Sequence, residues 1–280
     1  MKVAGFIPLL AAAAALLLPG LAVSQVPPAQ LQPGQLQPGQ LRPHRAEYTL
    51  RLGTALNATR IGSVVQDIVF TCDGWRIRRE LIVDASLTPS FKVSFTSRLE
   101  GDERRGKGFA WRALQALNGT EREVKGTAER KDGAWQVDRT TPDGPQQSPL
   151  PSLTLMPVAA VDWLLRRLAG GSESFPLLLF VPEADGGAFL LDAKRATVGA
   201  ADATPPSQRR VEVPGTRSWP FALAVTRAGA ADGKPLVTLR GRLFDSGVID
   251  GLVADAGVVT VAAHLRDLQM HEVPACPASN

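Results

Sequence analysis

Apolar side chains recur at every second position along much of the chain. Residues 47–52, 75–83 and 91–95 show this alternation. The same strand-like character returns later, in residues 175–181, 188–198, 221–227, 236–244 and 258–268. A strand with one buried face requires a period of two, so the pattern predicts antiparallel β-strands in both halves of the chain.

The turns between these strands carry their own signal. Asp-Gly or Asn-Gly pairs occur at 73–74, 118–119, 132–133 and 232–233. Such pairs supply the positive φ angles that tight hairpins need, and their spacing suits strands that follow one another along a sheet. The strings 84–86 and 245–247 also resemble turns. A meander is therefore predicted.

One segment has helical spacing instead. Residues 156–169 carry Pro157 in the first turn, arginines in the last turn and Gly170-Gly171 as a stop. We expect this helix to cap an open end of the sheet and to join two sheet-rich halves, 44–150 and 151–280. The predicted fold class is mainly β, with a central helix and enough length for a substantial core.

Residues 1–24 predict an export signal. A lysine follows the first methionine, an apolar run extends to Leu18, and small residues precede the expected cleavage near Ser24. The alternative is a retained membrane anchor. However, the run is shorter than the roughly 20 apolar residues that cross a bilayer, and Pro19-Gly20 interrupts it. No later segment is long and apolar enough to span, so we expect no membrane span after signal cleavage.

Residues 25–43 predict a flexible leader. The pentapeptide Gln-Leu-Gln-Pro-Gly occurs at 30–34 and again at 35–39, and a shortened copy follows at 40–43. Repeats with proline and glycine build neither a strand ladder nor a helix, so a spacer is favoured over a partner-binding segment. The folded region is expected to begin near His44.

The charge of the chain is nearly balanced. Lysine and arginine total 31 against 27 aspartate and glutamate, so the net charge is about +3 once Lys2 leaves with the signal. Arginines gather at 76–79 and 103–107, but acidic residues lie among them, and Tyr48 is the only tyrosine. Nucleic-acid binding uses a dense basic face with stacking aromatics. We therefore interpret both clusters as solvated strand faces and turns, and expect no nucleic-acid partner.

The chain contains two cysteines, Cys72 and Cys276. Exported compartments are oxidising, and two cysteines allow a single intramolecular pairing, so with the export signal they suggest one long-range disulfide. Two buried free thiols are the alternative. A redox-active pair is disfavoured, because such thiols usually lie close together in sequence.

Catalytic and metal-binding signatures are weak. The string closest to a serine-hydrolase motif, residues 170–174, lacks the final glycine and follows a helix instead of a strand. His44, His264 and His271 form no two-histidine zinc motif, and two cysteines give a zinc cage little support. We therefore expect no enzymatic activity, no metal and no cofactor.

Several short motifs stand in a definite order along the chain. They are His44-Arg45-Ala46-Glu47-Tyr48, Thr71-Cys72-Asp73-Gly74-Trp75, Gly108-Phe109-Ala110-Trp111, the proline-led helix, Ser218-Trp219-Pro220-Phe221 and the C-terminal cysteine. Their order and spacing, from about His44 to Cys276, resemble the EipB-like cell-envelope integrity proteins. These are periplasmic proteins of alphaproteobacteria, long described as containing a domain of unknown function.

The resemblance implies a large antiparallel β assembly, spiral-like or an open barrel, with helices on its concave side. It also implies a disulfide between Cys72 and Cys276, and a role in maintaining the envelope without an assigned reaction. On this basis we expect a non-enzymatic periplasmic protein that supports cell envelope integrity. It would act as a disulfide-clasped scaffold or partner-binding module, with an envelope protein or a lipid as its partner.

The alternative function is a periplasmic carrier of a lipid or lipoprotein. A curved sheet closed on one side by a helix makes a concave apolar pocket. The residues that could cover or line it are Val158, Val161, Leu165 and Leu168 on one helix face, and the large apolar anchors Trp111, Trp163 and Trp219. The simpler interpretation is that all seven are ordinary core residues.

Overall fold

The computed structural model describes residues 40–55, 57–88, 90–184, 187–196, 211–215, 217–230 and 233–276. The predicted export signal, the leader up to residue 39 and the aspartate of the 232–233 turn lie outside these residues. Among the described residues, no helix has the length and apolar character needed to cross a membrane.

Fifteen strands form one sheet, in the order β8-β7-β6-β5-β4-β3-β2-β1-β15-β14-β13-β12-β11-β10-β9. The first half of the chain contributes β1 (His44–Leu52), β2 (Arg60–Thr71), β3 (Gly74–Thr88), β4 (Phe91–Arg104), β5 (Gly108–Leu117), β6 (Thr120–Lys131), β7 (Ala134–Thr141) and β8 (Gly144–Leu150). The second half contributes β9 (Thr154–Leu155), helix α2 (Pro157–Ala169), β10 (Ser174–Phe180), β11 (Ala188–Arg195), β12 (Ser218–Arg227), β13 (Val237–Phe244), β14 (Ile249–Asp255) and β15 (Thr260–Met270). The mainly β fold class is confirmed.

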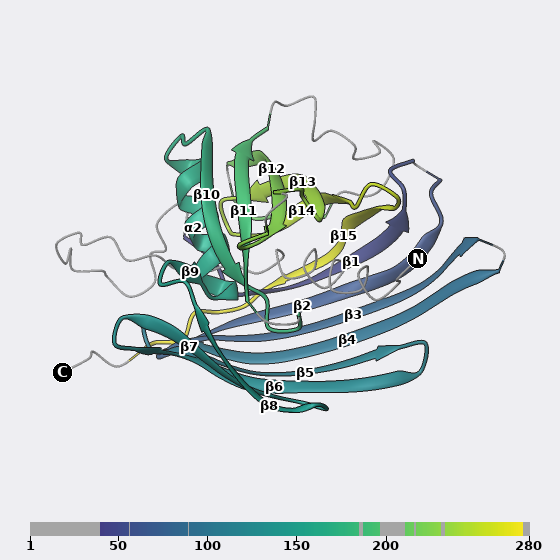
Figure 1. The fold of residues 1–280 in the computed structure, drawn as a ribbon. Helices are drawn as coiled ribbons and strands as arrows, with labels where there is room; N and C mark the ends of the chain where they lie inside the picture. Colours follow the sequence, from purple (N-terminus) through teal and green to yellow (C-terminus); the bar gives the residue numbers. More distant parts are fainter. Residues whose placement is uncertain are drawn as a thin grey trace.

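The connectivity requires the sheet to roll up. The chain enters at β1, in the middle of the strand order, reaches one edge at β8, continues from the other edge at β9 and returns to pair β15 with β1. A flat sheet of this size would separate its edge strands by about 67 Å. Only residues 151–153 join them, and that link spans at most about 14 Å. The result is a nearly closed, barrel-like sheet (Figure 1).

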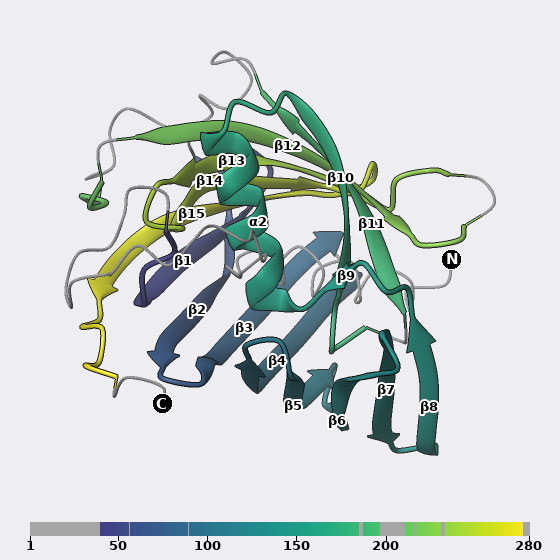
Figure 2. The same ribbon diagram turned by 90° about the vertical axis from the view of Figure 1, so that its left-hand side faces the viewer.

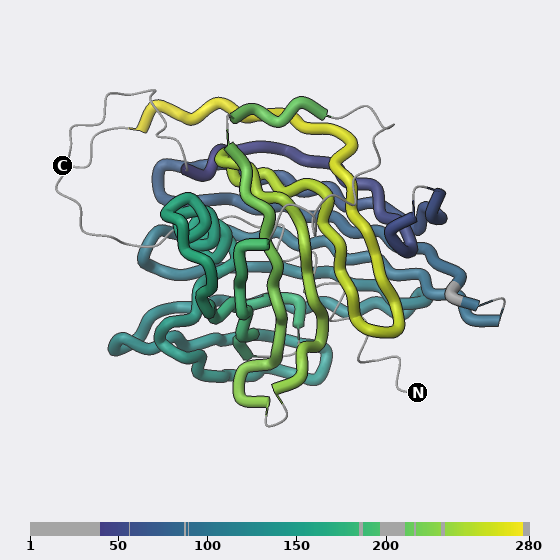
Figure 3. The backbone as a smooth tube through the Cα atoms, turned by 90° about the horizontal axis from the view of Figure 1, so that it is seen from above, coloured from purple at the N-terminus to yellow at the C-terminus, as the bar shows by residue number. Residues whose placement is uncertain are grey.

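The two halves of the sheet face each other across the core. Seen from above, the strands of the second half cross those of the first at a steep angle (Figure 3). Helix α2 lies on the concave side, between the two halves (Figure 2). The helix begins at the predicted proline, and Gly170 ends it by donating its backbone N–H to the carbonyl of Arg166. The predicted helix is confirmed.

Two of the predicted hairpin turns follow the predicted chemistry. Asn118 and Gly119 have φ angles of 48° and 84°, and Asp132 and Gly133 have 52° and 82°, as a two-residue type I′ turn requires. In the turn at 73–74 neither residue has a positive φ, so the prediction is wrong there. The turn predicted at 84–86 is wrong, because these residues lie within β3. Strand pairing with β4 continues through them and outweighs the local turn propensity of Asp and Ser.

The described fold begins a few residues before His44. Leu41 is 4% exposed and belongs to the hydrophobic core, and the backbone N–H of Arg42 donates to the carbonyl of Ser246 at 3.0 Å. Gly247, with a positive φ of 88°, leaves room for the Leu41 side chain, since a Cβ there would lie 2.4 Å from Leu41 Cδ1. The shortened repeat at 40–43 is therefore part of the packed structure, although it was expected to belong to the leader.

Candidate functional site

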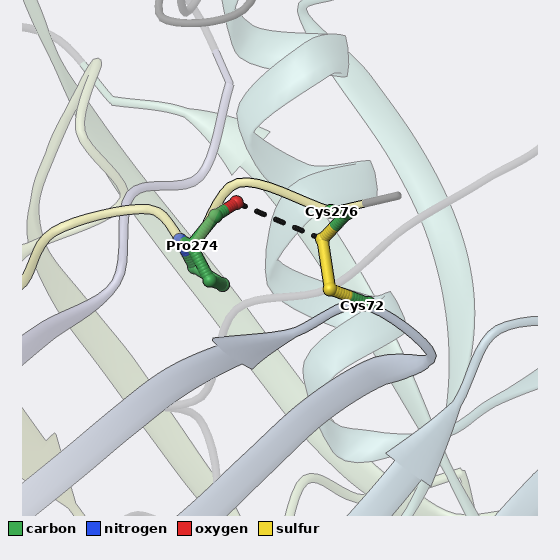
Figure 4. The surroundings of a disulfide bond; sticks show 3 residues. All are labelled: Cys72, Pro274 and Cys276. Atoms are coloured by element: carbon green, nitrogen blue, oxygen red, sulfur yellow. Dashed lines mark hydrogen bonds between the residues drawn. A yellow bond between two sulfur atoms is a disulfide. The ribbon is translucent and has the colours of Figure 1, made fainter. Parts of the chain in front are cut away.

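A disulfide joins the second hairpin of the sheet to the C-terminal end of the described chain. Cys72 lies in the turn between β2 and β3, and Cys276 follows the last strand. Their Cα atoms are 5.4 Å apart, and Cys276 Sγ lies 3.7 Å from the carbonyl oxygen of Pro274 (Figure 4). The bond holds the C-terminal segment 271–276 against the turn between β2 and β3.

The same segment is anchored a second time at its beginning. His271 Nε2 lies 2.6 Å from Asp67 Oδ1 on β2, and the His271 backbone N–H donates to the carbonyl of Pro43 at 2.9 Å. His44 lies next to this contact, and its burial lowers its pKa to about 4, so this imidazole is neutral near pH 7. The C-terminal segment is therefore fastened both to β2 and to Pro43, near the start of the described chain.

The seven residues predicted as pocket or helix-face residues all lie in or against the hydrophobic core. The four on α2 are exposed by 1% or less, and Trp111 and Trp219 by 5% each. Trp163 is partly buried and packs edge-on against Phe175, with ring centroids 5.1 Å apart. In this structure they pack against the protein itself.

A carboxyl group from the first half of the chain caps helix α2. The helix has no side-chain cap of its own at Met156 and no acidic residue in its first turn. Glu103 of β4 instead accepts hydrogen bonds from the backbone N–H groups of Val158 at 2.7 Å and Ala159 at 2.8 Å. Burial raises the pKa of Glu103 to about 8, although these two bonds lower it. Glu103 thereby ties the helix to the concave side of the sheet.

A buried ion pair lies on the same concave side. Arg79 of β3 pairs through Nη2 with Oε1 of Glu183, in the connection between β10 and β11, and the two side chains are 1% and 0% exposed. The next residue of that connection, Ala184, accepts a hydrogen bond from Arg139 Nη1 of β7 at 3.4 Å. Two arginines of the first half thus hold one loop of the second half.

The convex side of the first half carries charges of alternating sign. Cross-strand pairing places Arg45, Asp67, Arg78, Glu100 and Arg112 in one row over β1 to β5. Beside this row lies a shallow depression of about 220 Å³. Further outward residues form the pairs Arg76–Asp102, Glu80–Arg98 and Arg112–Glu123, at 2.9, 2.7 and 3.0 Å. Because neighbouring charges neutralise one another, this side is not a dense basic face.

The interpretation of the two basic clusters is therefore only partly right. Arg76 and Arg78 are exposed on the convex side, as expected. Arg79 and Glu103 are buried, which the sequence analysis missed. The alternation in 75–83 could have indicated that Arg79 is buried, because Arg79 lies on the same strand face as the buried residues Ile77 and Leu81.

The remaining candidates form no metal site among the described residues. His264 is half-buried, which lowers its pKa, and lies on β15. No group of three or more histidine, cysteine, aspartate or glutamate side chains in the described ranges could hold a metal ion. Residues 170–174 contain the helix stop and the start of β10.

The fold and the site together define a class: a rolled, mostly antiparallel β-sheet protein, clasped by a disulfide, with buried polar groups that hold its own helix and loop. A family model described as EipB-like matches residues 35–272, and the chain belongs to this family. No curated protein matches the chain.

A similar solved structure is a β-barrel-like protein from Brucella abortus, described as containing a domain of unknown function, DUF1849. It is 18% identical to this chain, with a TM-score of 0.69, and the alignment covers 83% of this chain and 99% of that one. At this identity the likeness establishes the fold.

Proposed function

We propose that this protein is exported to the periplasm and supports cell envelope integrity without catalysing a reaction. It acts as a disulfide-clasped scaffold that presents a rigid outer surface to an envelope protein. Membership of the EipB-like family supports this role, and the disulfide is of the kind that persists in an oxidising compartment.

One observation carries the proposal. The concave side of the sheet packs against the chain's own elements, namely α2, which Glu103 caps, and the loop that Arg79 and Arg139 hold. A partner would therefore meet the outer surface. The exposed ion pairs there contribute little to stability and can exchange for contacts with a partner.

Crosslinking in intact cells tests the proposal. A photoreactive amino acid placed at Arg112, whose side chain is 64% exposed, should trap a specific envelope protein that mass spectrometry identifies. A matched probe at Leu153, 80% exposed on the β8–β9 link, controls for random collisions. A strain that lacks the protein should become sensitive to detergent, and the wild-type gene should restore resistance. Equal crosslinks at both positions, or a deletion without an envelope defect, would contradict the scaffold role.

The carrier role is the less supported of the two expectations. The helix face that was to cover a pocket packs in the core instead. Lipid that co-purifies with the mature protein in stoichiometric amount, detected by mass spectrometry, would favour the carrier over the scaffold.

A further inference from the structure

The contact between Arg79 and Glu183 is unusual in its surroundings. Both side chains are almost completely buried, beside apolar residues of the same sheet face such as Ile77, Leu81 and Leu99. The buried polar residue Gln66 lies directly across from Arg79 on β2. Removing two charges from water costs several kcal/mol for each ion, and well-packed apolar residues are often as stabilising in such a position. Stability by itself therefore does not account for an arginine and a glutamate here.

The ion pair between Arg79 and Glu183 also leaves hydrogen-bonding groups of both side chains without a partner among the described residues. Arginine and carboxylate frequently form two parallel hydrogen bonds. Here Arg79 Nη2 contacts Glu183 Oε1, whereas Arg79 Nη1 and Glu183 Oε2 have no hydrogen-bond partner among the described residues. Ser97 Oγ is also buried without such a partner. Ser97 is the inward residue of β4 diagonally across from Arg79, because Arg79 pairs with Leu99. Arg79 Nη1 and Ser97 Oγ are thus two buried groups on neighbouring strands of the same sheet face.

The acid that occupies this position comes from a loop and not from the sheet. Residues 181–184 are all buried, and the end of the β10–β11 hairpin points toward the concave side of the first-half strands (Figure 1). At the base of the loop, the ring of Phe180 packs edge-on against Trp111, with centroids 5.1 Å apart. Polar contacts from the sheet to the loop include the ion pair and the 3.4 Å bond from Arg139 to Ala184. The carboxylate of Glu183 therefore reaches Arg79 from outside the sheet, as the anionic group of a bound ligand would.

We propose that Arg79, with Ser97 beside it, is a binding site for the oxyanion group of a ligand, a carboxylate or a phosphate. Glu183 fills this site as an internal stand-in, carried on the loop 181–184. A ligand oxyanion that engages both Arg79 and Ser97 would displace Glu183 and move the loop away from the sheet. The ligand is either a free anion or the head group of an amphiphile, since the recognition chemistry is the same for both.

Binding to Glu183→Gln tests the proposal, because glutamine keeps the shape of the side chain and removes the competing charge. The ligands are inorganic phosphate, decanoate and neutral decyl maltoside, and the two amphiphiles are kept below their critical micelle concentrations. Binding is measured by calorimetry and by thermal unfolding. Phosphate or decanoate should bind the variant at least about tenfold more tightly than the wild type, because no internal anion competes. The same anion should raise the melting temperature of Glu183→Gln more than that of the matched exposed variant Glu123→Gln. Adding Arg79→Gln should abolish the anion preference.

Comparing phosphate with decanoate distinguishes a free anion from the head group of an amphiphile. Binding of both phosphate and decanoate indicates a free oxyanion, and binding of decanoate without phosphate indicates an amphiphile head group. Equal binding of decyl maltoside, or an affinity unchanged by Glu183→Gln, would overturn the proposal. If Glu183→Gln does not fold, hydrogen exchange of the wild type decides: the anion should accelerate exchange in 181–184 and decyl maltoside should not. Unchanged exchange with the anion would overturn the proposal as well.

Discussion

The pH dependence of stability should reveal the buried carboxyl group of Glu103. Its pKa rises from 4.5 to about 8 on folding, so the folded protein holds this proton more tightly than the unfolded chain. The contribution of Glu103 to the free energy of unfolding is therefore complete below about pH 4.5. It is lost as the pH rises through 8.

His44 acts in the opposite direction at lower pH. Its pKa falls from 6.5 to about 4 on folding, so its contribution is complete above pH 6.5 and is lost as the pH falls through 4. The two slopes oppose each other between about pH 4.5 and 6.5. His264, whose pKa is also lowered by burial, acts in the same direction as His44. From 6.5 to 8 the slope of Glu103 dominates, at up to about 1.4 kcal/mol per pH unit, which predicts a loss of up to about 2 kcal/mol over this interval.

Urea unfolding, followed by circular dichroism at several pH values, measures this loss. Glu103→Gln should make the free energy of unfolding nearly independent of pH between 6.5 and 8. Glu100→Gln is the matched control, because Glu100 lies on the same strand with its side chain 60% exposed, and it should keep the wild-type slope. A wild-type stability that stays level or rises from pH 6.5 to 8 would refute the reasoning. It would show that the two backbone donors at the start of α2 outweigh the effect of burial on the carboxyl group.

Three further predictions concern stability. Cys72→Ser, or a reducing agent, should lower the melting temperature and increase protease sensitivity by removing up to about 5 kcal/mol of loop-closure stabilisation; two free thiols in protein taken from the periplasm would contradict this. Leu165→Ala, in the core face of α2, should lower the free energy of unfolding in denaturant by about 2–5 kcal/mol, whereas Leu153→Ala at an exposed position should lower it by less than about 0.5 kcal/mol. Equal losses for the two variants would argue against the observed packing. Asn118→Ala should cost about 1 kcal/mol, because its φ is 48° and its side chain accepts a bond from the Ser94 N–H; an unchanged melting temperature would count against this turn.

Several features of the fold were predictable because they depend on neighbouring residues. Alternation over 47–52 and 75–83 indicated strands, and Asn118-Gly119 indicated a type I′ turn, since each signal arises within a few positions of the chain. The helix was predictable for the same reason, from its spacing and from the proline and glycine at its ends. The pairing of Cys72 with Cys276 was indicated by the cysteine count together with the export signal and by the family resemblance, with two free thiols as the alternative.

The sequence by itself determined the helix, the two cysteines that can pair, and the strands whose alternation is clear, whereas strands such as β2 and β5 to β8 were not assigned from it. Tertiary structure decided the contacts on the concave side, where Arg79 meets Glu183 across 104 positions and Glu103 meets Val158 across 55. It also overrode the turn-like string 84–86, whose backbone pairs with β4. The physical reason is that periodicity reports which face of a strand is buried, whereas the partner on that face depends on how the sheet rolls. The rolling in turn follows from strand order, because a three-residue link must bring the two edges of a fifteen-strand sheet together.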